Sequence, residues 1–213
     1  MPMSSFEHLP VVMHYLSAIK PTKVLDIGIG MGTYGFMARQ YFDIGSERLL
    51  KSEWKIQIDG VEIFENYRNP IWDYVYNKVL ICDIRDIIDS LDRYDVVMCN
   101  DVLEHFTKVE AKTLCSKLLD VCDVLIVTTP TKNFPQGAWG GNSAEEHHCL
   151  LKAEDFPNLI AKTCAGVTTC YVCSKEQSTY DTLKFAQSNC PNCQPRKLPY
   201  FFARLLKKFN NAN

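Results

Sequence analysis

The sequence predicts an α/β protein with a doubly wound, mostly parallel sheet of seven strands. Two observations support this prediction. Short apolar runs alternate with amphipathic segments along most of the chain, and a glycine-rich turn follows the first of these runs. Such alternation is typical of consecutive βαβ units, in which a helix connects two parallel strands.

The elements can be placed in order from their residue patterns. An amphipathic helix is expected at 6–19, ending before Pro21, because proline does not continue a helix. The strands are expected at short runs of apolar and β-branched residues, and the next helices at segments with helical spacing of apolar residues. We therefore expect strand 24–29, helix 34–42, strand 56–61, strand 79–82, helix 83–91, strand 94–99, helix 107–119 and strand 124–128.

A long loop is expected at 130–151, after the fifth strand. It is rich in Gly, Asn, Trp and His, and a loop of this length beside the ends of strands is more often functional than not. Beyond the loop we expect a helix at 154–164. Strands at 167–172 and 182–185 would then complete the sheet.

Composition and charge favour one domain and a small-molecule substrate. The 213 residues carry a net charge of −2, which suits one α/β domain at 1–188 followed by a basic tail with cysteine and proline at 189–213. From Thr182 onward there are lysines and arginines but no Asp or Glu, so the preceding part of the chain is acidic. An acidic body argues against broad contacts with phosphates, so we do not expect a nucleic acid partner.

The cysteines and the termini indicate a cytoplasmic protein. Most of the ten cysteines lie inside apolar patterns, where free cysteine packs as a small hydrophobe, so a reducing compartment is expected. The first 20 residues do not have the pattern expected of a targeting segment, and no apolar run approaches the roughly 18 residues of a membrane span. The tail has an amphipathic, basic segment at 196–209, which suits either a terminal helix docked on the domain or a helix at the inner face of an anionic membrane. The oligomeric state is not indicated.

An acid and three glycines mark a cofactor site after the first strand. Asp26 lies in this strand, and Gly28, Gly30 and Gly32 follow at alternate positions. Glycines let the backbone approach a ligand closely, and the next helix presents its N-terminus there. A dinucleotide-binding G-x-G-x-x-G turn would need glycine at Thr33, so a nucleotide-type cofactor other than NAD is expected.

Polar residues follow the next three strands. Glu62 ends the second strand and suits the two hydroxyls of a ribose. Asp83 follows the third strand, where it suits the exocyclic amine of an adenine, with Ile84 packed on the ring. Asn100 ends the fourth strand and is a further candidate for contact with the cofactor.

Taken in order, these motifs resemble those of class I S-adenosylmethionine-dependent methyltransferases over about residues 22–130. The resemblance implies the Rossmann-like fold of that family and methyl transfer to a small acceptor. It also implies that Asp26 and the glycines hold the methionine portion of S-adenosylmethionine, Glu62 the ribose, and Asp83 with Ile84 the adenine.

The segment after the fourth strand contains the candidate catalytic residues. Glu104 and His105 lie at the face from which a methyl group would be transferred, and His147 lies in the long loop. Histidine has an ordinary pKa of about 6.5, so His105 is the first candidate for a general base. The alternative is that Glu104 and His105 only begin a helix and line the pocket.

A divalent metal site is a second hypothesis for the same segment. Asp101-x-x-Glu104-His105 resembles the E-x-x-E-H segment of plant small-RNA 2′-O-methyltransferases and quinone-pathway O-methyltransferases, although Asp stands at the first position here. That resemblance implies a cation held by Asp101, Glu104, His105 and His148, which would lower the pKa of a bound hydroxyl. Many methyltransferases carry a similar segment without a metal.

The long loop is the expected wall of the acceptor site. Trp139 suits stacking on a sugar or another flat face, and Asn142, Glu145 and His147 suit binding to hydroxyls. The Asn-x-x-Glu-x-His pattern resembles loops of methyltransferases that act on glycans and small metabolites. We therefore expect a hydroxyl or amine of a sugar or related metabolite as the acceptor. The alternative is a surface loop without a function.

Four cysteines have the spacing of a structural zinc site: Cys170, Cys173, Cys190 and Cys193. Against zinc, residues three apart on a strand point to opposite faces, so Cys170 and Cys173 would not easily reach one ion.

Two other functions remain as alternatives to small-molecule methylation. One is an RNA 2′-O-methyltransferase, and the other is a non-catalytic cofactor-binding or scaffold module.

Overall fold

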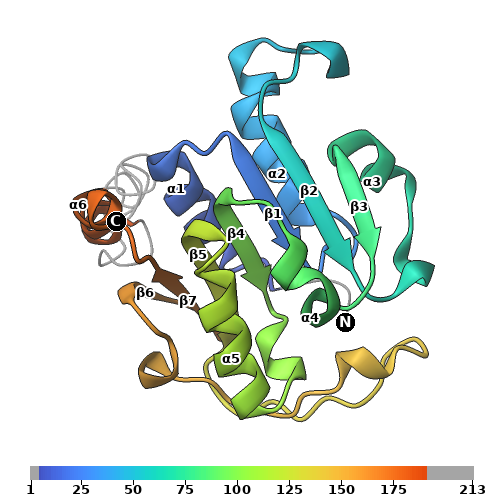
Figure 1. Ribbon diagram of the computed structural model, residues 1–213, viewed down its shortest axis with the longest axis vertical. Coiled ribbons are helices and arrows are strands. Elements are labelled where there is room, and N and C mark those ends of the chain that lie inside the picture. The colour runs from blue at the N-terminus through green and yellow to red at the C-terminus, as the bar shows by residue number, and fades with distance from the viewer. Residues whose placement is uncertain (1–4, 191–213) are drawn as a thin grey trace, which may run out of the picture.

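Seven strands form one twisted sheet in the computed structural model, which describes residues 5–190 (Figure 1). The strand order is β3-β2-β1-β4-β5-β7-β6; β1 to β5 pair with one another in parallel, and β7 is antiparallel to β5 and β6. The predicted doubly wound, mostly parallel fold is therefore confirmed. The strands are β1 (Lys23–Ile27), β2 (Gln57–Glu62), β3 (Lys78–Ile81), β4 (Tyr94–Asn100), β5 (Cys122–Pro130), β6 (Leu159–Ala165) and β7 (Thr168–Cys173).

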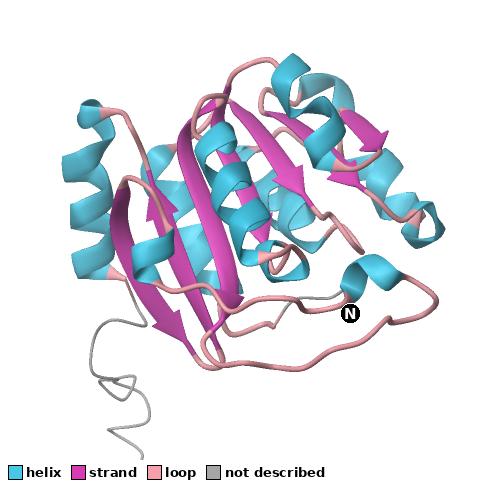
Figure 2. Ribbon diagram, turned by 60° about the horizontal axis from the view of Figure 1, so that its bottom comes forward, coloured by secondary structure: helices cyan, strands magenta, loops and turns pink. Residues whose placement is uncertain are grey.

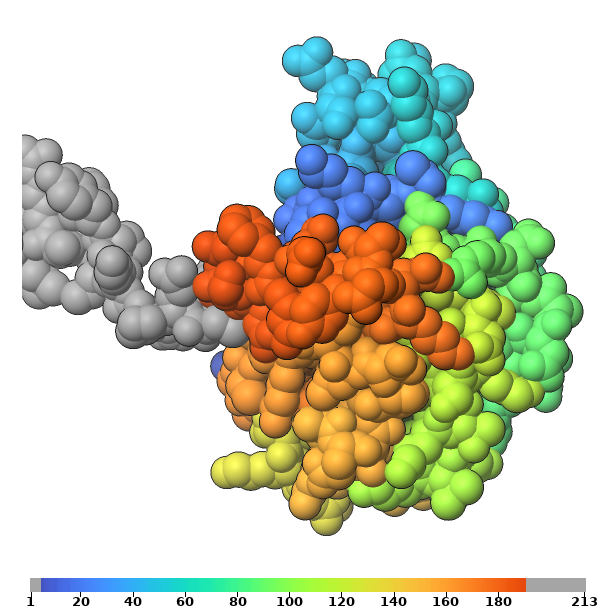
Figure 3. All heavy atoms as spheres, turned by 60° about the vertical axis from the view of Figure 1, so that its left-hand side comes forward, coloured from blue at the N-terminus to red at the C-terminus, as the bar shows by residue number. Residues whose placement is uncertain are grey.

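Helices cover both faces of the sheet (Figure 2). Helices α1, α2, α3 and α6 contribute to the core on one face, and α4 and α5 to the core on the other. Figure 3 shows α6 beside α1 at the β6 edge. The helices are α1 (Leu9–Ile19), α2 (Thr33–Phe42), α3 (Pro70–Val75), α4 (Ile84–Ile87), α5 (Lys108–Leu118) and α6 (Gln177–Asn189).

The strands are apolar on both faces because both faces are covered. In β4, Val96 and Met98 belong to the core under α1 and α2, whereas Val97 and Cys99 belong to the core under α4 and α5. Successive side chains of a strand point to opposite faces, so each strand supplies both cores. Near-continuous apolar runs were therefore the correct signal for these strands.

Two predicted elements are wrong in type. The expected helix at 154–164 is the strand β6, in which Ala161, Thr163 and Ala165 are buried and the residues between them are exposed, so the burial repeats every second residue. The expected strand at 182–185 lies within helix α6, whose buried Leu183 and Ala186 are one helical turn apart. Packing of α6 on α1 decided the second case.

The long loop lies across the carboxyl ends of the parallel strands. It leaves β5 and passes below the arrowheads of β1, β2 and β4 in Figure 1. Strand order reverses between β1 and β4, and in sheets of this kind ligands bind outside the carboxyl ends of the strands at this position. The fold therefore places the binding site between this loop and the β1–β4 junction.

Within residues 5–190, no helix is long and apolar enough to cross a membrane.

Candidate active site

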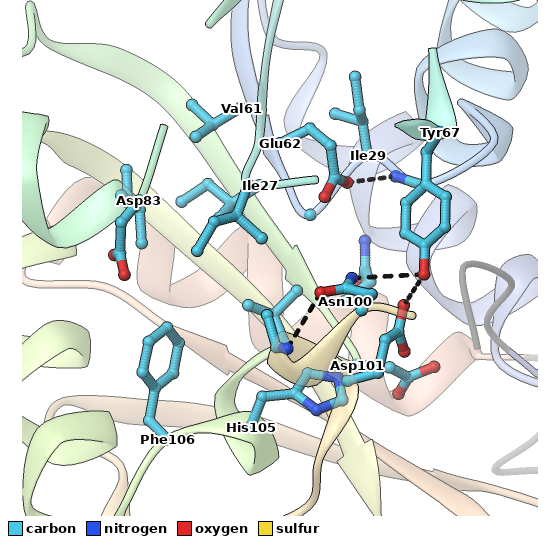
Figure 4. A pocket seen from close by; sticks show the side chains of 18 of the residues that line it. Ile27, Ile29, Val61, Glu62, Tyr67, Asp83, Asn100, Asp101, His105 and Phe106 are labelled. Carbon is cyan, nitrogen blue, oxygen red and sulfur yellow. Dashed lines mark hydrogen bonds between the residues drawn. The ribbon is translucent and has the colours of Figure 1, made fainter. Parts of the chain in front are cut away.

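A cavity of about 360 Å³ opens at the carboxyl ends of β1, β2 and β4, and it is named here the first cavity. Its volume lies within the range of small-molecule pockets. Figure 4 shows Glu62 and Tyr67 on one side of it and Asp83 and Phe106 on the other. The cofactor residues predicted from the sequence that line it are Gly28, Gly30, Glu62, Asp83, Ile84 and Asn100.

The glycine turn holds the backbone close to this cavity. Gly28 has φ +70°, and a Cβ atom there would overlap the side chain of Val102. The Gly30 amide donates a hydrogen bond of 2.9 Å to Glu62 Oε2. Gly32 does not line the cavity; with φ +87° it precedes the first residue of α2. Its role is therefore to form the turn.

Asp26 also lies outside the lining of the first cavity, and its predicted contact with the cofactor stays a prediction. The side chain is 2% exposed and accepts a 2.7 Å hydrogen bond from the Tyr76 hydroxyl. Burial raises the pKa of Asp26 to about 7. This hydrogen bond therefore links β1 to Tyr76, the residue that follows α3.

Glu62 is buried in the wall of the first cavity and has a fixed orientation. Its Oε1 accepts a hydrogen bond of 3.0 Å from the Phe64 amide, and its Oε2 accepts the bond from Gly30. Burial raises the pKa of Glu62, although these amide bonds oppose the shift. The carboxyl keeps acceptor capacity beyond these two bonds, because a carboxylate has about four lone-pair sites.

Asp83 stands where the third strand leads into α4. It accepts a hydrogen bond of 2.8 Å from the Arg85 amide and forms an ion pair of 2.7 Å with the Arg85 guanidinium. Burial opposes ionisation, but these bonds from Arg85 hold the pKa of Asp83 below its usual range. The carboxylate is therefore charged at neutral pH, beside the buried Ile84.

Asn100 has the most unusual environment in this cavity. It is 3% exposed, yet neither its amide nitrogen nor its amide oxygen has a hydrogen-bond partner among residues 5–190. Buried polar groups are nearly always hydrogen-bonded, and an unpaired one costs about 1–3 kcal/mol. The Asn100 amide can donate and accept hydrogen bonds at the end of β4, so it fits a ligand that has both hydrogen-bond donors and acceptors.

The long loop closes one side of the first cavity through residues that sequence reasoning only partly identified. The Tyr67 hydroxyl donates a hydrogen bond of 2.8 Å to Glu145 Oε1 and accepts one of 3.3 Å from the Asn142 amide (Figure 4). Tyr67 was not predicted, and its only signal is an aromatic residue five positions after Glu62. Trp139 is 45% exposed and lines neither this cavity nor the next one, so its predicted stacking role is not supported.

A second cavity of about 680 Å³, named here the second cavity, adjoins the first. Asp101 and His105 line both cavities, so the two meet at these residues. Its walls come from the segment before α1, from the beginning of the long loop, and from the turn between β6 and β7. The lining residues predicted as catalytic are Glu104, His105 and His147.

His105 is held in one orientation. Its Nδ1 lies 3.2 Å from the Glu146 carbonyl oxygen, which can only accept, so the neutral ring carries its proton on Nδ1 and a lone pair on Nε2. Burial lowers the pKa of His105, which favours this neutral form at pH 7. His147 lies beside it with ring centroids 5.0 Å apart, and His147 Nδ1 is 2.7 Å from the Phe134 carbonyl oxygen.

Glu104 is 1% exposed, and its Oε2 has no hydrogen-bond partner in the described part of the chain. Burial raises the pKa of Glu104 well above its ordinary value, and the nearby Asp101 adds to the shift, while the Thr129 hydroxyl opposes it. The neutral acid is therefore favoured. A carboxylic acid in this state can both donate and accept a hydrogen bond in the second cavity.

Asp101 is held by residues distant in the sequence. Its φ of +52° is uncommon for a residue other than glycine. Its Oδ1 accepts a hydrogen bond of 3.0 Å from the Thr128 hydroxyl, and its Oδ2 lies 3.4 Å from Nε2 of His8. His8 is fully buried and was not predicted. Nothing in the local sequence of His8 indicates this contact, because only the tertiary fold brings it to β4.

The predicted divalent metal set is not assembled in the structure. Among the described residues, no three His, Cys, Asp or Glu side chains lie close enough together to hold an ion. His148 lines the first cavity and Glu104 the second, while Asp101 and His105 stand between them. The four side chains therefore surround a junction of two cavities and do not converge on one point.

The predicted zinc site is not formed by its described members either. Cys170 packs in the core under α1 and α6, and Cys173 packs in the core under α5, on the opposite face of the sheet. Cys190 is fully buried in the same core as Cys170. Cys193 and the tail segment 196–209 lie outside the described residues.

The arrangement described above defines a class I S-adenosylmethionine-dependent methyltransferase domain. The chain matches the model of the methyltransferase domain family over residues 7–163, and it belongs to that family. A comparison with curated protein sequences finds no match.

Solved structures with a similar fold include methyltransferases. Magnesium protoporphyrin IX methyltransferase from Synechocystis PCC 6803, with bound S-adenosylhomocysteine (SAH), has a TM-score of 0.56 and 17% identity over 79% of this chain and 82% of that chain. The N-terminal domain of EvdMO1, with SAH and D-fucose, has a TM-score of 0.53 and 13% identity over 80% and 82%. An rRNA methylase from Escherichia coli has a TM-score of 0.53 and 16% identity over 79% and 64%. At these identities the likeness shows the fold alone.

Proposed function

We propose that this domain transfers a methyl group from S-adenosylmethionine in the first cavity to a hydroxyl of a small molecule in the second cavity. One observation carries the proposal: the two cavities meet at Asp101 and His105, at the carboxyl end of β4. Two adjoining sites that share one wall let both substrates be held in reacting order, and such positioning is worth about 7–11 kcal/mol.

The residues of the first cavity fit S-adenosylmethionine. Glu62 would accept hydrogen bonds from the ribose hydroxyls, and Asp83 would accept one from the adenine amine beside Ile84. The unpaired amide of Asn100 would form hydrogen bonds with the amino acid portion of S-adenosylmethionine, which contains both hydrogen-bond donors and acceptors. Gly28 and Gly30 would allow the backbone to approach it. S-adenosylmethionine, when bound, supplies a methyl group on an electrophilic sulfonium.

The chain's own part of the reaction is the removal of a proton. With Nδ1 bonded to the Glu146 carbonyl, the neutral ring of His105 keeps its lone pair on Nε2, and the side chain lines both cavities. It would accept the proton of the acceptor hydroxyl, a role that commonly contributes about 10²–10⁴-fold. Glu104 and His147 would position the acceptor from the second cavity.

Most of the loop residues behind the expected acceptor class lie outside the second cavity. The expectation of a sugar hydroxyl or amine relied on Trp139, Asn142, Glu145 and His147, and of these His147 lines the second cavity. RNA is not favoured, because only Arg85 and Lys132 of the lining residues carry a permanent positive charge, and Arg85 is paired with Asp83. A small acceptor that enters the second cavity agrees best with these contacts.

The proposal is tested by titrating the purified full chain with S-adenosylmethionine and, in parallel, with NAD, followed by assays of methyl transfer. We expect micromolar binding of S-adenosylmethionine and none of NAD. A His105→Ala variant should lose transfer while still binding S-adenosylmethionine, whereas a His14→Ala control on α1 should keep both binding and transfer. Binding without transfer to any acceptor would support the non-catalytic module, and absence of binding by a folded sample would overturn the proposal.

A further inference from the structure

We propose that the second cavity is built for an aromatic alcohol, whose ring lies against Phe6 and Phe134 and whose hydroxyl meets His105. This inference rests on the proposed function and adds the chemical class of the acceptor.

The first argument is an apolar wall that residues 5–190 leave exposed. Phe6, Phe134 and Val167 are 66%, 60% and 66% exposed, although they come from three separate segments, and all three line the second cavity. Exposed large apolar side chains scattered singly are ordinary, but several that gather around one cavity mark a binding site. A free sugar, with hydroxyls around its ring, would leave this wall in contact with polar groups.

The second argument is a series of rings that leads from this wall to the reactive face. The Phe134 and His147 ring centroids are 6.1 Å apart, and those of His147 and His105 are 5.0 Å apart with planes at 60°. Aromatic rings favour edge-to-face or offset contacts at 4.5–7 Å between centroids. A flat acceptor ring would extend this series at favourable distances.

The third argument is the pair of hydrogen-bonding side chains beside the junction with the first cavity. The neutral ring of His105 keeps its lone pair on Nε2, and Glu104 Oε2 has no partner among residues 5–190. An acceptor with one hydroxyl at the end of an apolar body matches this distribution. Phenolic hydroxyls also have pKa values near 10, so a neutral histidine removes their proton far more easily than that of an alkyl alcohol.

The reaction is balanced without a further reagent. The acceptor oxygen forms the new bond to the methyl carbon, the sulfonium sulfur keeps the electron pair of the bond that breaks, and the hydroxyl proton passes to Nε2 of His105. The products are an aryl methyl ether and SAH, with the proton later released to water.

The experiment compares three probes with the full chain and saturating S-adenosylmethionine: naphthol, its saturated counterpart decahydronaphthol, and D-fucose. Release of SAH and the mass of the ether product report transfer. We expect naphthol to be methylated with a kcat/KM at least tenfold above that of either other probe. A preference for D-fucose or decahydronaphthol, or binding of naphthol without its methylation, would overturn the inference while leaving the proposed function intact.

Variants of the wall test the location. Phe134→Ala should raise the KM for naphthol about tenfold, because part of an aromatic contact is lost, and should leave the Kd of S-adenosylmethionine unchanged. Phe6→Ala is a second variant with the same expectation, should the first fail to fold. Phe185→Ala, on α6 and 71% exposed, is the matched control and should change neither value. An unchanged KM in both cavity variants would refute the location.

Discussion

The unpaired amide of Asn100 permits a prediction that separates binding from stability. Asn100 is 3% exposed and neither polar atom of its amide has a partner in the described chain, so the free protein bears the cost of its burial. If S-adenosylmethionine supplies the missing partners, that cost is recovered on binding. Asn100→Ala should therefore weaken binding without destabilising the free protein.

The expected increase in the Kd of S-adenosylmethionine follows from the hydrogen bonds that Asn100→Ala removes. Removal of an amide that pairs with ligand groups leaves those groups unsatisfied, at about 1–3 kcal/mol, which corresponds to a Kd raised roughly 5–150-fold. The free energy of unfolding without ligand should change by less than about 1 kcal/mol or increase, because an unsatisfied buried group is removed. Most substitutions of buried residues instead destabilise the protein.

The assay pairs calorimetric titration of S-adenosylmethionine with denaturant unfolding in its absence. Asn66→Ala is the control: Asn66 is exposed and lines neither cavity. A Kd within twofold of the unaltered protein would refute the role of Asn100 in binding. A loss of stability above about 2 kcal/mol would show that the amide is paired in the free protein.

Three further predictions concern titratable residues. Transfer should decline as pH falls through the pKa of His105, which burial places below the ordinary value of about 6.5. His105→Asn should abolish this pH dependence and lower kcat about 10²–10⁴-fold. An unchanged profile of transfer against pH in the variant would contradict the role of His105 as a base. Burial raises the pKa of Asp26 to about 7, so the unfolded chain loses its proton first and stability should fall as pH rises from about 4 to 7. Asp26→Asn should remove up to about 4 kcal/mol of this decline, measured by urea unfolding without ligand at both pH values; identical slopes in the two proteins would exclude the raised pKa. Glu104→Leu should raise the KM for the acceptor about tenfold in steady-state assays. Glu104→Gln keeps a neutral hydrogen-bond donor and acceptor, so its KM should equal that of the unaltered protein. A raised KM in Glu104→Gln would show that a charged Glu104 is required.

The fold class and most of the first cavity were predictable because their signals are local. Apolar runs, the glycine turn, and polar residues such as Glu62, Asp83 and Asn100 at strand ends report on neighbouring backbone, and parallel strands bring their carboxyl ends to one edge. The same logic did not predict the hydrogen bond from Tyr76 to Asp26, because the position of Asp26 in a strand does not reveal which distant side chain lies beside it. The helix expected at 154–164 was wrong because periodicity over a short apolar segment does not distinguish a helix from a strand.

The sequence by itself determined the class of fold, most of the polar residues that line the first cavity, and the segment with Glu104 and His105. Only the tertiary structure showed the second cavity, because its walls come from residues 5–7, 130–136 and 166–168, which are distant in the chain. It also separated Cys170 from Cys173 across the sheet and placed His8 against Asp101. The physical reason is the same in each case. Local patterns are set by backbone geometry and burial of neighbouring residues, whereas contacts between distant segments depend on how complete layers pack together.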